Sequence, residues 1–330
     1  MRRALLCLLV LAIFGAGGAA ALAAFTATTS NPDNNFAAAA TFGGMKVATG
    51  TYTGNNTDNR AIAVAFQPDV VIVKGDRAEF AVIRTSSMAG DVSKPMGGAT
   101  ALTADLIQAL TATGFQVGRD KTVNFNNTRY DWIAFKTYGN QMKVGSYTGN
   151  GTSQSIGSMG FSPDYAMVLS AGADAAVQSS RTMGATFRFD ETAAAANGVT
   201  SLDQAGFSVG GSTETNVNPR TYHYVAWNEI NGLMQESVYF GNGGDNRNIG
   251  GVTFQPAYVI VRPSTNGTDC DRGVHRPASL VGDSSLHFPN LVNAADVIQA
   301  LNATGFQVGS DCKVNANGRS YYWMAFRTGS

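Results

Sequence analysis

The sequence predicts an all-β protein: three tandem antiparallel β-sandwich modules of the jelly-roll kind, preceded by a free N-terminal strand. Three observations predict this class. A block of about 95 residues occurs three times, its motifs have the patterns of short strands, and Gly-Asn or Asn-Gly pairs separate them. Such pairs form the turns between antiparallel strands. The modules are expected at 45–140, 141–233 and 234–330, called repeats 1, 2 and 3 below.

Four motifs occur in the same order in every repeat, at offsets of about 92 to 99 residues. They are an opening segment with Gly-Asn, a Phe-x-Pro strand, a Gly-Phe-x-Val-Gly segment and an aromatic closing segment. In repeats 1, 2 and 3 respectively they lie at 50–55, 66–73, 113–118 and 130–135; at 145–150, 161–168, 205–210 and 222–227; and at 238–243, 254–261, 304–309 and 321–326. Four motifs in one order, three times over, indicate a triplicated building block.

The motifs have the residue patterns of strands. In the closing segment of repeat 1, Tyr130, Trp132 and Ala134 share one face of an extended chain. The run 70–73 is apolar throughout, which fits a strand buried in a sandwich core. Trp132 and Trp323 could stack on sugars, but tryptophans on an alternating strand are expected in the core.

One stretch predicts a short helix or helical loop in two repeats. Ala104–Leu110 matches 295–301, and its apolar positions 106, 107 and 110 follow the spacing of an amphipathic turn. A single helical element per repeat is therefore expected there.

Composition excludes several classes of function. The 330 residues carry no net charge and only 14% are charged, so a basic face for nucleic acid is not expected. Three histidines are too few for a multi-histidine metal enzyme.

Residues 1–23 are predicted to be a secretory signal peptide. Two arginines precede the apolar run 4–14, and small residues lead to a cleavage site before Ala24. If uncleaved, the uncharged residues 4–24 would be long enough for a membrane anchor. Cleavage predicts a secreted protein, extracellular or at the cell surface, with no remaining membrane segment.

Cysteine usage agrees with export. Cys7 lies in the signal, and Cys270 and Cys312 remain. In an oxidising compartment such a pair is expected to form a disulfide, which would stabilise the fold by roughly 4 kcal/mol in the chain-entropy model. The alternative is two unrelated buried thiols, and a zinc site lacks further ligands.

Catalytic motifs are not found, so an enzyme is not predicted. The sequence contains neither a Gly-x-Ser-x-Gly elbow nor a His-Glu-x-x-His helix. Asp69 and Asp164 recur after a proline but become Ala257 in repeat 3. They are interpreted as turn or cap residues, with catalytic acids as the alternative.

Two polar loops are candidate ion or glycan sites. Their oxygen-rich sequences match each other in repeats 1 and 3, and such loops can bind calcium or sugar hydroxyls. The alternative is a hairpin turn with a surface Asp–Arg pair. The candidate residues are Asn55, Asp58, Arg60, Asn242, Asp245 and Arg247. Calcium is thus a hypothesis, and no other cofactor or metal is expected.

An arginine and an aspartate recur at fixed spacing in two repeats. Arg84 and Asp91 align with Arg276 and Asp283, and repeat 2 has Arg181 nearby. Together they could form an internal ion pair or line a loop-end pocket, and the structural role is preferred.

Two family resemblances follow from these motifs. Over most of 46–328, the Tyr-Thr-Gly-Asn-Gly opening, the Phe-Gln-Pro-Asp-Val strand and the Tyr-x-Trp-x-Ala-Phe ending resemble tandem β-sandwich repeats of phage tail-fibre-like and bacterial surface proteins. That resemblance implies surface display but no reaction.

The N-terminus has a second resemblance. Leu22-Ala23-Ala24-Phe25-Thr26, followed by Asn34-Asn35-Phe36-Ala37-Ala38, resembles the TasA/camelysin group over about 20 residues. It implies release by a SipW-type signal peptidase and biofilm matrix fibres in which each subunit inserts its N-terminal strand into the next. That group has one domain where this chain has three repeats.

The residues themselves support strand donation. In the linker 24–44 the residues expected to donate the strand are Phe25, Phe36, Ala38, Ala40 and Phe42. A free apolar strand can pair with a neighbour's sheet edge, and head-to-tail pairing builds an open filament. Pairing within the chain and an unstructured linker are the alternatives.

These observations predict a secreted structural protein, a subunit of an extracellular filament or biofilm matrix. Its expected partner is itself, with glycans or a cell surface as further partners. The alternatives are a monomeric carbohydrate-binding adhesin and, less in keeping with the sequence, a polysaccharide-active enzyme.

Overall fold

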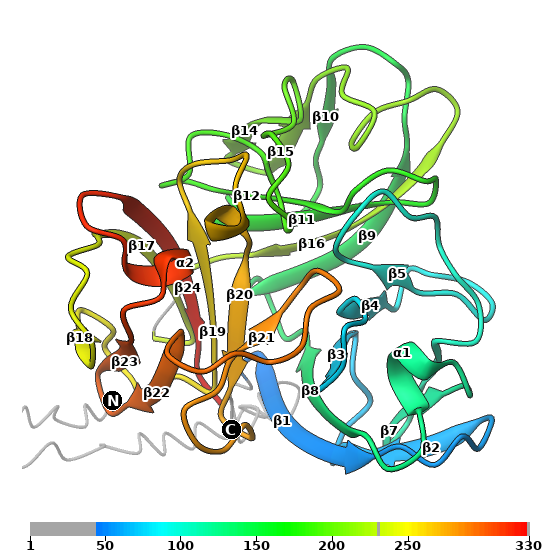
Figure 1. The fold of residues 1–330 in the computed structure, drawn as a ribbon. Helices are drawn as coiled ribbons and strands as arrows, with labels where there is room; N and C mark the ends of the chain where they lie inside the picture. Colours follow the sequence, from blue (N-terminus) through cyan, green and yellow to red (C-terminus); the bar gives the residue numbers. More distant parts are fainter. Residues whose placement is uncertain (1–43, 230–231, 329–330) are drawn as a thin grey trace, which may run out of the picture. The chain divides into compact units, whose positions relative to one another are not determined.

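The computed structural model describes residues 44–229 and 232–328, and this part of the chain is almost entirely β. Each repeat contains a five-stranded and a three-stranded antiparallel sheet (Figure 1). The sequence-based prediction of three antiparallel sandwich units is confirmed. The signal peptide and the linker strand lie outside the described residues.

Repeat 1 contains eight strands and one short helix. They are β1 (Lys46–Thr53), β2 (Arg60–Ala63), β3 (Val70–Gly75), β4 (Val82–Thr85), β5 (Lys94–Pro95), β6 (Ile107–Thr111), β7 (Gly114–Val117), α1 (Lys121–Asn124) and β8 (Arg129–Lys136). The large sheet has the order β1-β8-β3-β4-β5, and the small sheet the order β2-β7-β6.

Repeats 2 and 3 have the same topology. Repeat 2 has β9 (Met142–Thr148), β10 (Gln154–Ile156), β11 (Tyr165–Ser170), β12 (Val177–Ser180), β13 (Phe187–Arg188), β14 (Val199–Asp203), β15 (Gly206–Val209) and β16 (Thr221–Trp227). Repeat 3 has β17 (Met234–Phe240), β18 (Arg247–Ile249), β19 (Tyr258–Pro263), the 3-10 turn η1 (Asp269–Asp271), β20 (Val274–Pro277), β21 (Leu286–His287), β22 (Ile298–Asn302), β23 (Gly305–Val308), α2 (Cys312–Asn315) and β24 (Ser320–Phe326). Their large sheets run β9-β16-β11-β12-β13 and β17-β24-β19-β20-β21.

Each small sheet packs on one face of its large sheet and forms a core within the repeat. In repeat 1 this core holds Tyr130, Trp132 and Ala134, the three residues expected to share a face. Trp323 is buried in the corresponding core of repeat 3. Both tryptophans therefore pack in the core, as the alternating pattern predicts, and neither offers a stacking surface for a sugar.

The other face of each large sheet contributes to a fourth core that all three repeats share. At its centre lie Phe135, Trp227 and Phe326, which occupy the same position in the three closing strands. Their ring centroids are 5.6 Å (Phe135–Trp227), 5.2 Å (Phe135–Phe326) and 5.5 Å (Trp227–Phe326) apart. The repeats thus meet around a pseudo-threefold axis, a relation that the order of the motifs along the chain does not predict.

Main-chain hydrogen bonds join each repeat to both of the others. They run from Ala81 N to Phe288 O (2.9 Å), from Gly273 N to Phe189 O (3.0 Å) and from Leu102 N to Ala171 O (3.2 Å). Repeat 1 therefore contacts repeats 2 and 3, and repeats 2 and 3 contact each other. Three head-to-tail contacts close a ring within one chain.

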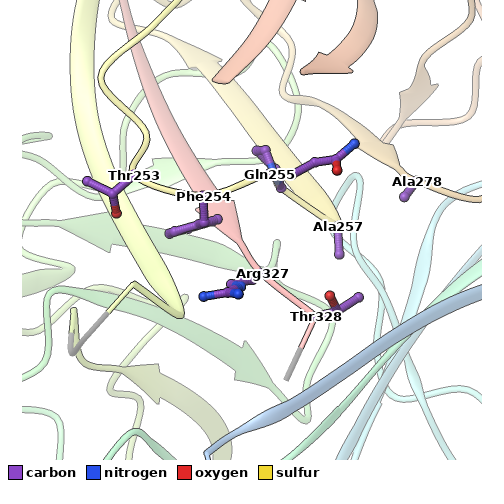
Figure 2. A pocket seen from close by; sticks show the side chains of 8 residues that line it. Thr253, Phe254, Gln255, Ala257, Ala278, Arg327 and Thr328 are labelled. Carbon is purple, nitrogen blue, oxygen red and sulfur yellow. The ribbon is translucent and has the colours of Figure 1, made fainter. Parts of the chain in front are cut away.

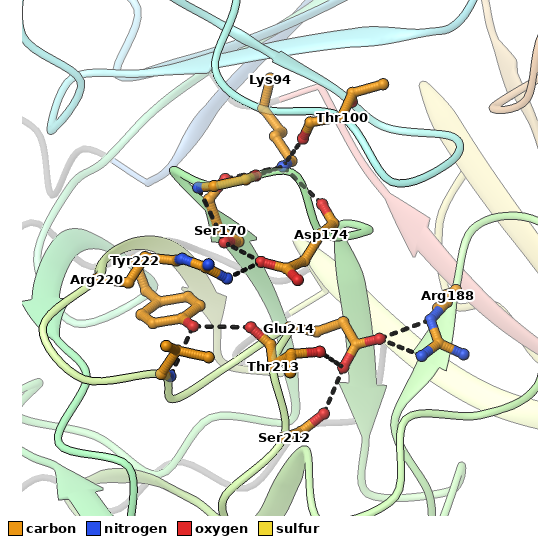
Figure 3. A network of polar contacts seen from close by, with 12 residues as sticks. Lys94, Thr100, Ser170, Asp174, Arg188, Ser212, Thr213, Glu214, Arg220 and Tyr222 are labelled. Carbon is orange, nitrogen blue, oxygen red and sulfur yellow. Dashed lines mark hydrogen bonds and ion pairs between the residues drawn. The ribbon is translucent and has the colours of Figure 1, made fainter.

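A buried cation lies at each junction of this ring. The ammonium group of Lys74 and the guanidinium of Arg262 donate to main-chain carbonyls of a neighbouring repeat. Lys94 of repeat 1 donates to the carbonyls of Ser170 (2.8 Å), Asp174 (2.7 Å) and Gly172 (3.1 Å) of repeat 2 (Figure 3). Burial lowers the pKa of Lys94 to about 7.

Replacing Lys94 by methionine is expected to lower the unfolding free energy of the three-repeat fold by about 3 kcal/mol, because buried carbonyls lose their hydrogen-bond donor. Urea unfolding at pH 6, where the ammonium is charged, measures the loss. Exchanging Lys143, an exposed lysine of repeat 2, for methionine is the control and should leave the unfolding free energy within about 0.5 kcal/mol. Equal effects in the two variants would contradict the role of the junction cation.

The expected helices at 104–110 and 295–301 are wrong. Both stretches enter strands, β6 and β22. The pairing register of β6 shifts between Ile107 and Ala109, so the strand contains a bulge. A bulge places two consecutive residues against one partner and breaks the alternation of faces. That break produced the apolar spacing that resembled a helix.

The disulfide between Cys270 and Cys312 is present, with Cα atoms 5.2 Å apart, and it joins η1 to α2 in repeat 3. Within the described residues, no helix is both long enough and apolar enough to cross a bilayer.

Candidate functional site

The residues expected to donate a strand, Phe25, Phe36, Ala38, Ala40 and Phe42, lie outside the described residues. In every large sheet the first strand is an edge strand: β1, β9 and β17 each pair with one neighbour among the described residues. Each of them exposes two residues on the face opposite its tyrosine, which is Tyr52, Tyr147 or Tyr239.

The edge strand of repeat 3 differs from the other two in its exposed residues. Val238 and Phe240 of β17 are 39% and 66% exposed. The register places hydroxyl-bearing residues at the same positions of the other repeats: Thr51 and Thr53 in β1, and Ser146 and Thr148 in β9. Two apolar side chains on the same face of an unpaired edge are a feature of association surfaces.

The two oxygen-rich loops are held by bonds within the fold. The buried amide of Asn124 accepts a bond from Asn55 N (3.0 Å) and donates to Thr57 O (2.8 Å). Arg60 also donates to Asn124 Oδ1 (3.1 Å) and lies over the ring of Tyr52. The expected Asp–Arg pair is therefore not what fixes this turn.

The carboxylates of these loops are also engaged. Asp58 Oδ1 accepts from Gln108 Nε2 (2.8 Å), and this bond lowers the pKa of Asp58. Repeat 3 repeats the arrangement with Asp245 and Gln299 (2.9 Å), while Asn242 and Arg247 bond the amide of Asn315. Among residues 44–229 and 232–328, no three His, Cys, Asp or Glu side chains are grouped to hold a metal ion.

Arg84 is buried and does not bond Asp91. Its guanidinium donates to main-chain carbonyls, among them Gly90 O (2.6 Å) and Met88 O (3.2 Å). Arg276 makes the corresponding bonds in repeat 3. Strand register places Ser179, not Arg181, at this position in repeat 2.

A polar network occupies the junction of repeats 1 and 2 (Figure 3). Arg188 pairs with Glu214, and Arg220 pairs with Asp174. Burial raises the pKa of Glu214, but bonds from Ser212 and Arg188 outweigh it and leave the pKa below its usual value. Both ion pairs join residues of repeat 2, and the bonds from Lys94 to the carbonyls of Ser170, Gly172 and Asp174 connect this network to repeat 1.

The recurring aspartates cap the end of the closing strand, as the turn-or-cap interpretation predicts. Asp69 Oδ2 accepts from Thr137 N (2.9 Å), and Lys136 Nζ lies 3.9 Å away. Asp164 Oδ2 accepts from Glu229 N (2.6 Å), and Arg181 pairs with its other oxygen.

Repeat 3 has a pocket of about 460 Å³ where this aspartate would lie (Figure 2). Ala257 replaces the acid, and the pocket extends to the end of β24. Its lining residues are Thr253, Phe254, Gln255, Pro256, Ala257, Ala278, Arg327 and Thr328. The replacement is visible in the sequence, but the pocket is not, because it depends on how the chain closes around Ala257.

Comparison with known proteins gives one match. The family model of a domain of unknown function, DUF7483, matches residues 137–233, less than a third of the chain and over repeat 2. No curated protein and no solved structure matches this chain.

Proposed function

We propose that this protein is a secreted, non-catalytic structural subunit that assembles into an extracellular filament by donating its N-terminal strand to the β17 edge of the next subunit. The observation that carries the proposal is the pair Val238 and Phe240, exposed on an edge strand whose two counterparts carry hydroxyls.

The chemistry of the two partners is complementary. The acceptor offers an apolar strip and the main-chain groups of an edge strand other than Phe240 O, which accepts a bond from Arg247 Nη1 (2.5 Å). Main-chain bonds give affinity, and the apolar strip gives register. In an extended donor strand the larger apolar residues, Phe36 and Phe42, would share one face. Of the strands β1, β9 and β17, only β17 carries apolar residues at the two exposed positions, so it would be the preferred acceptor. One preferred acceptor in each subunit favours a linear filament over a branched network.

Assembly of the mature chain tests this proposal. Val238→Thr/Phe240→Thr, which gives β17 residues like those of β1, is expected to weaken subunit association more than a hundredfold, because roughly 3 kcal/mol of apolar burial is lost. Deleting residues 24–42 should abolish fibres. Electron microscopy and light scattering measure both effects.

The matched control exchanges two other exposed valines for threonine, Val281 (70% exposed) and Val292 (57% exposed), which lie outside β17. This control should form fibres at the wild-type concentration. Equal assembly of the β17 variant and the control would reject β17 as the acceptor. A wild-type chain that stays monomeric at every concentration would reject the filament and favour the monomeric adhesin.

A further inference from the structure

The pocket of repeat 3 lies in a main-chain frame that repeats 1 and 2 share. The equivalent main-chain bonds are Asp69 N to Phe135 O (2.7 Å), Asp164 N to Trp227 O (2.8 Å) and Ala257 N to Phe326 O (2.7 Å). A second set joins Ser86 N to Asp69 O (2.8 Å), Arg181 N to Asp164 O (3.0 Å) and Ala278 N to Ala257 O (2.7 Å). Because these distances agree, repeats 1 and 2 show what the same frame holds when the acid is present.

In both of those repeats the frame holds a carboxylate. This carboxylate accepts the main-chain N–H of the residue two positions after Phe135 or Trp227, which is Thr137 in repeat 1 and Glu229 in repeat 2. It also pairs with a cation, Lys136 in repeat 1 and Arg181 in repeat 2. In repeats 1 and 2 this frame is therefore a carboxylate-binding site that is occupied by a side chain of the same repeat.

Repeat 3 keeps this main-chain frame but has no aspartate in it. Arg327 stands at the position of Lys136, and Thr328 at that of Thr137. Ala257 and Ala278 stand where repeat 1 has Asp69 and Ser86, and both line the pocket. The corresponding pocket of repeat 1, about 320 Å³, is lined by Asp69 itself. Among the residues described, no carboxylate forms an ion pair with Arg327, whereas Lys136 and Arg181 each have one.

We infer that this pocket binds the carboxylate of an external acidic sugar, a hexuronate or a related sugar acid. The guanidinium of Arg327 presents the fork that matches a carboxylate in two parallel bonds. The remaining polar lining suits hydroxyl groups rather than a second charge: Gln255 is exposed, and the Thr253 hydroxyl donates to Gln235 Oε1 (3.1 Å), which leaves its own oxygen free to accept. The inference does not depend on filament assembly.

The decisive variant is Ala257→Asp, which restores the internal carboxylate of repeats 1 and 2. NMR titration with galacturonate and glucuronate, with galactose and glucose as uncharged counterparts, measures binding at 0.15 M salt. Uronates are expected to bind at millimolar concentration and the neutral sugars at least tenfold more weakly. Ala257→Asp and Arg327→Gln should each weaken uronate binding at least tenfold, while Lys143→Gln, which removes a cation outside the pocket, should not.

The inference would be overturned by no uronate binding, by equal binding of the neutral sugars, or by unchanged uronate binding in Ala257→Asp or Arg327→Gln. Binding of N-acetyl-aspartate amide as tightly as the uronates would reject a sugar as the ligand. The thermal melting temperature of Ala257→Asp should equal or exceed that of the wild type, so loss of binding is separable from loss of fold. Repeating the titration on the Val238→Thr/Phe240→Thr chain keeps the result independent of assembly.

Discussion

Replacing Trp227 by alanine is expected to lower the unfolding free energy of all three repeats together, by about 4 kcal/mol. Trp227 is fully buried, and its ring packs against Phe135 of repeat 1 and Phe326 of repeat 3. The cavity would open in the core that all repeats share, not within the sandwich of repeat 2. With stabilities of about 5–15 kcal/mol typical of folded proteins, such a loss is a large fraction of the total.

Calorimetry together with hydrogen exchange of each repeat measures this effect. One cooperative transition at a lower temperature, with equal loss of protection in all repeats, is expected. Trp227→Phe is the matched control, because repeats 1 and 3 carry phenylalanine at this position, and it should cost less than about 1.5 kcal/mol. Independent melting of repeat 2 would mean that the repeats are separate modules on a string.

The shared core marks the limit of what could be predicted from the sequence. The face that carries Tyr130, Trp132 and Ala134 was predicted, because it pairs with a small sheet in the same repeat. The opposite face, with Ile133 and Phe135, is equally buried. A strand that is apolar on both faces needs two covering layers, but the sequence does not say that the second layer is another repeat.

Local exceptions to alternation limited the rest. The bulge in β6 gave 104–110 the apolar spacing of a helix, and only the partner strand β7 reveals the extra residue. The candidate sites show the same pattern. The change from Asp69 to Ala257 is visible in the sequence. The sequence does not show that Arg327 and Thr328 line a pocket with this alanine, because the closing strand brings them together only in the fold.

Acidification is expected to destabilise the described unit before the carboxylates titrate, because all three histidines are buried. Burial, reinforced by the charge of Arg84, lowers the pKa of His223 to about 4. Burial, together with nearby lysines and Arg272, lowers the pKa of His287 to about 3. His275 is fully buried and its pKa also lies well below its usual value.

The sign of the effect follows from which state binds protons. The unfolded chain protonates its histidines below about pH 6.5, while the folded chain does not protonate His223 until about pH 4. Stability is therefore fully present above pH 6.5 and is lost as the pH falls toward the folded-state values. Each pKa unit corresponds to about 1.4 kcal/mol, so His223 alone contributes a loss of about 3 kcal/mol.

Urea unfolding between pH 7.5 and pH 4 measures this dependence. His223→Gln keeps a polar partner for Ser87, whose hydroxyl lies 2.9 Å from His223 Nδ1 across the junction of repeats 1 and 2. In this variant the unfolding free energy should depend on pH less steeply than in the wild type, by one proton or about 1.4 kcal/mol per pH unit below pH 6. The unfolding free energies of the two chains should therefore differ less at pH 7.5 than at pH 4. A wild-type unfolding free energy that stays constant from pH 7 to pH 5 would show that the imidazoles reach solvent, and the junctions would then be looser than their buried contacts indicate.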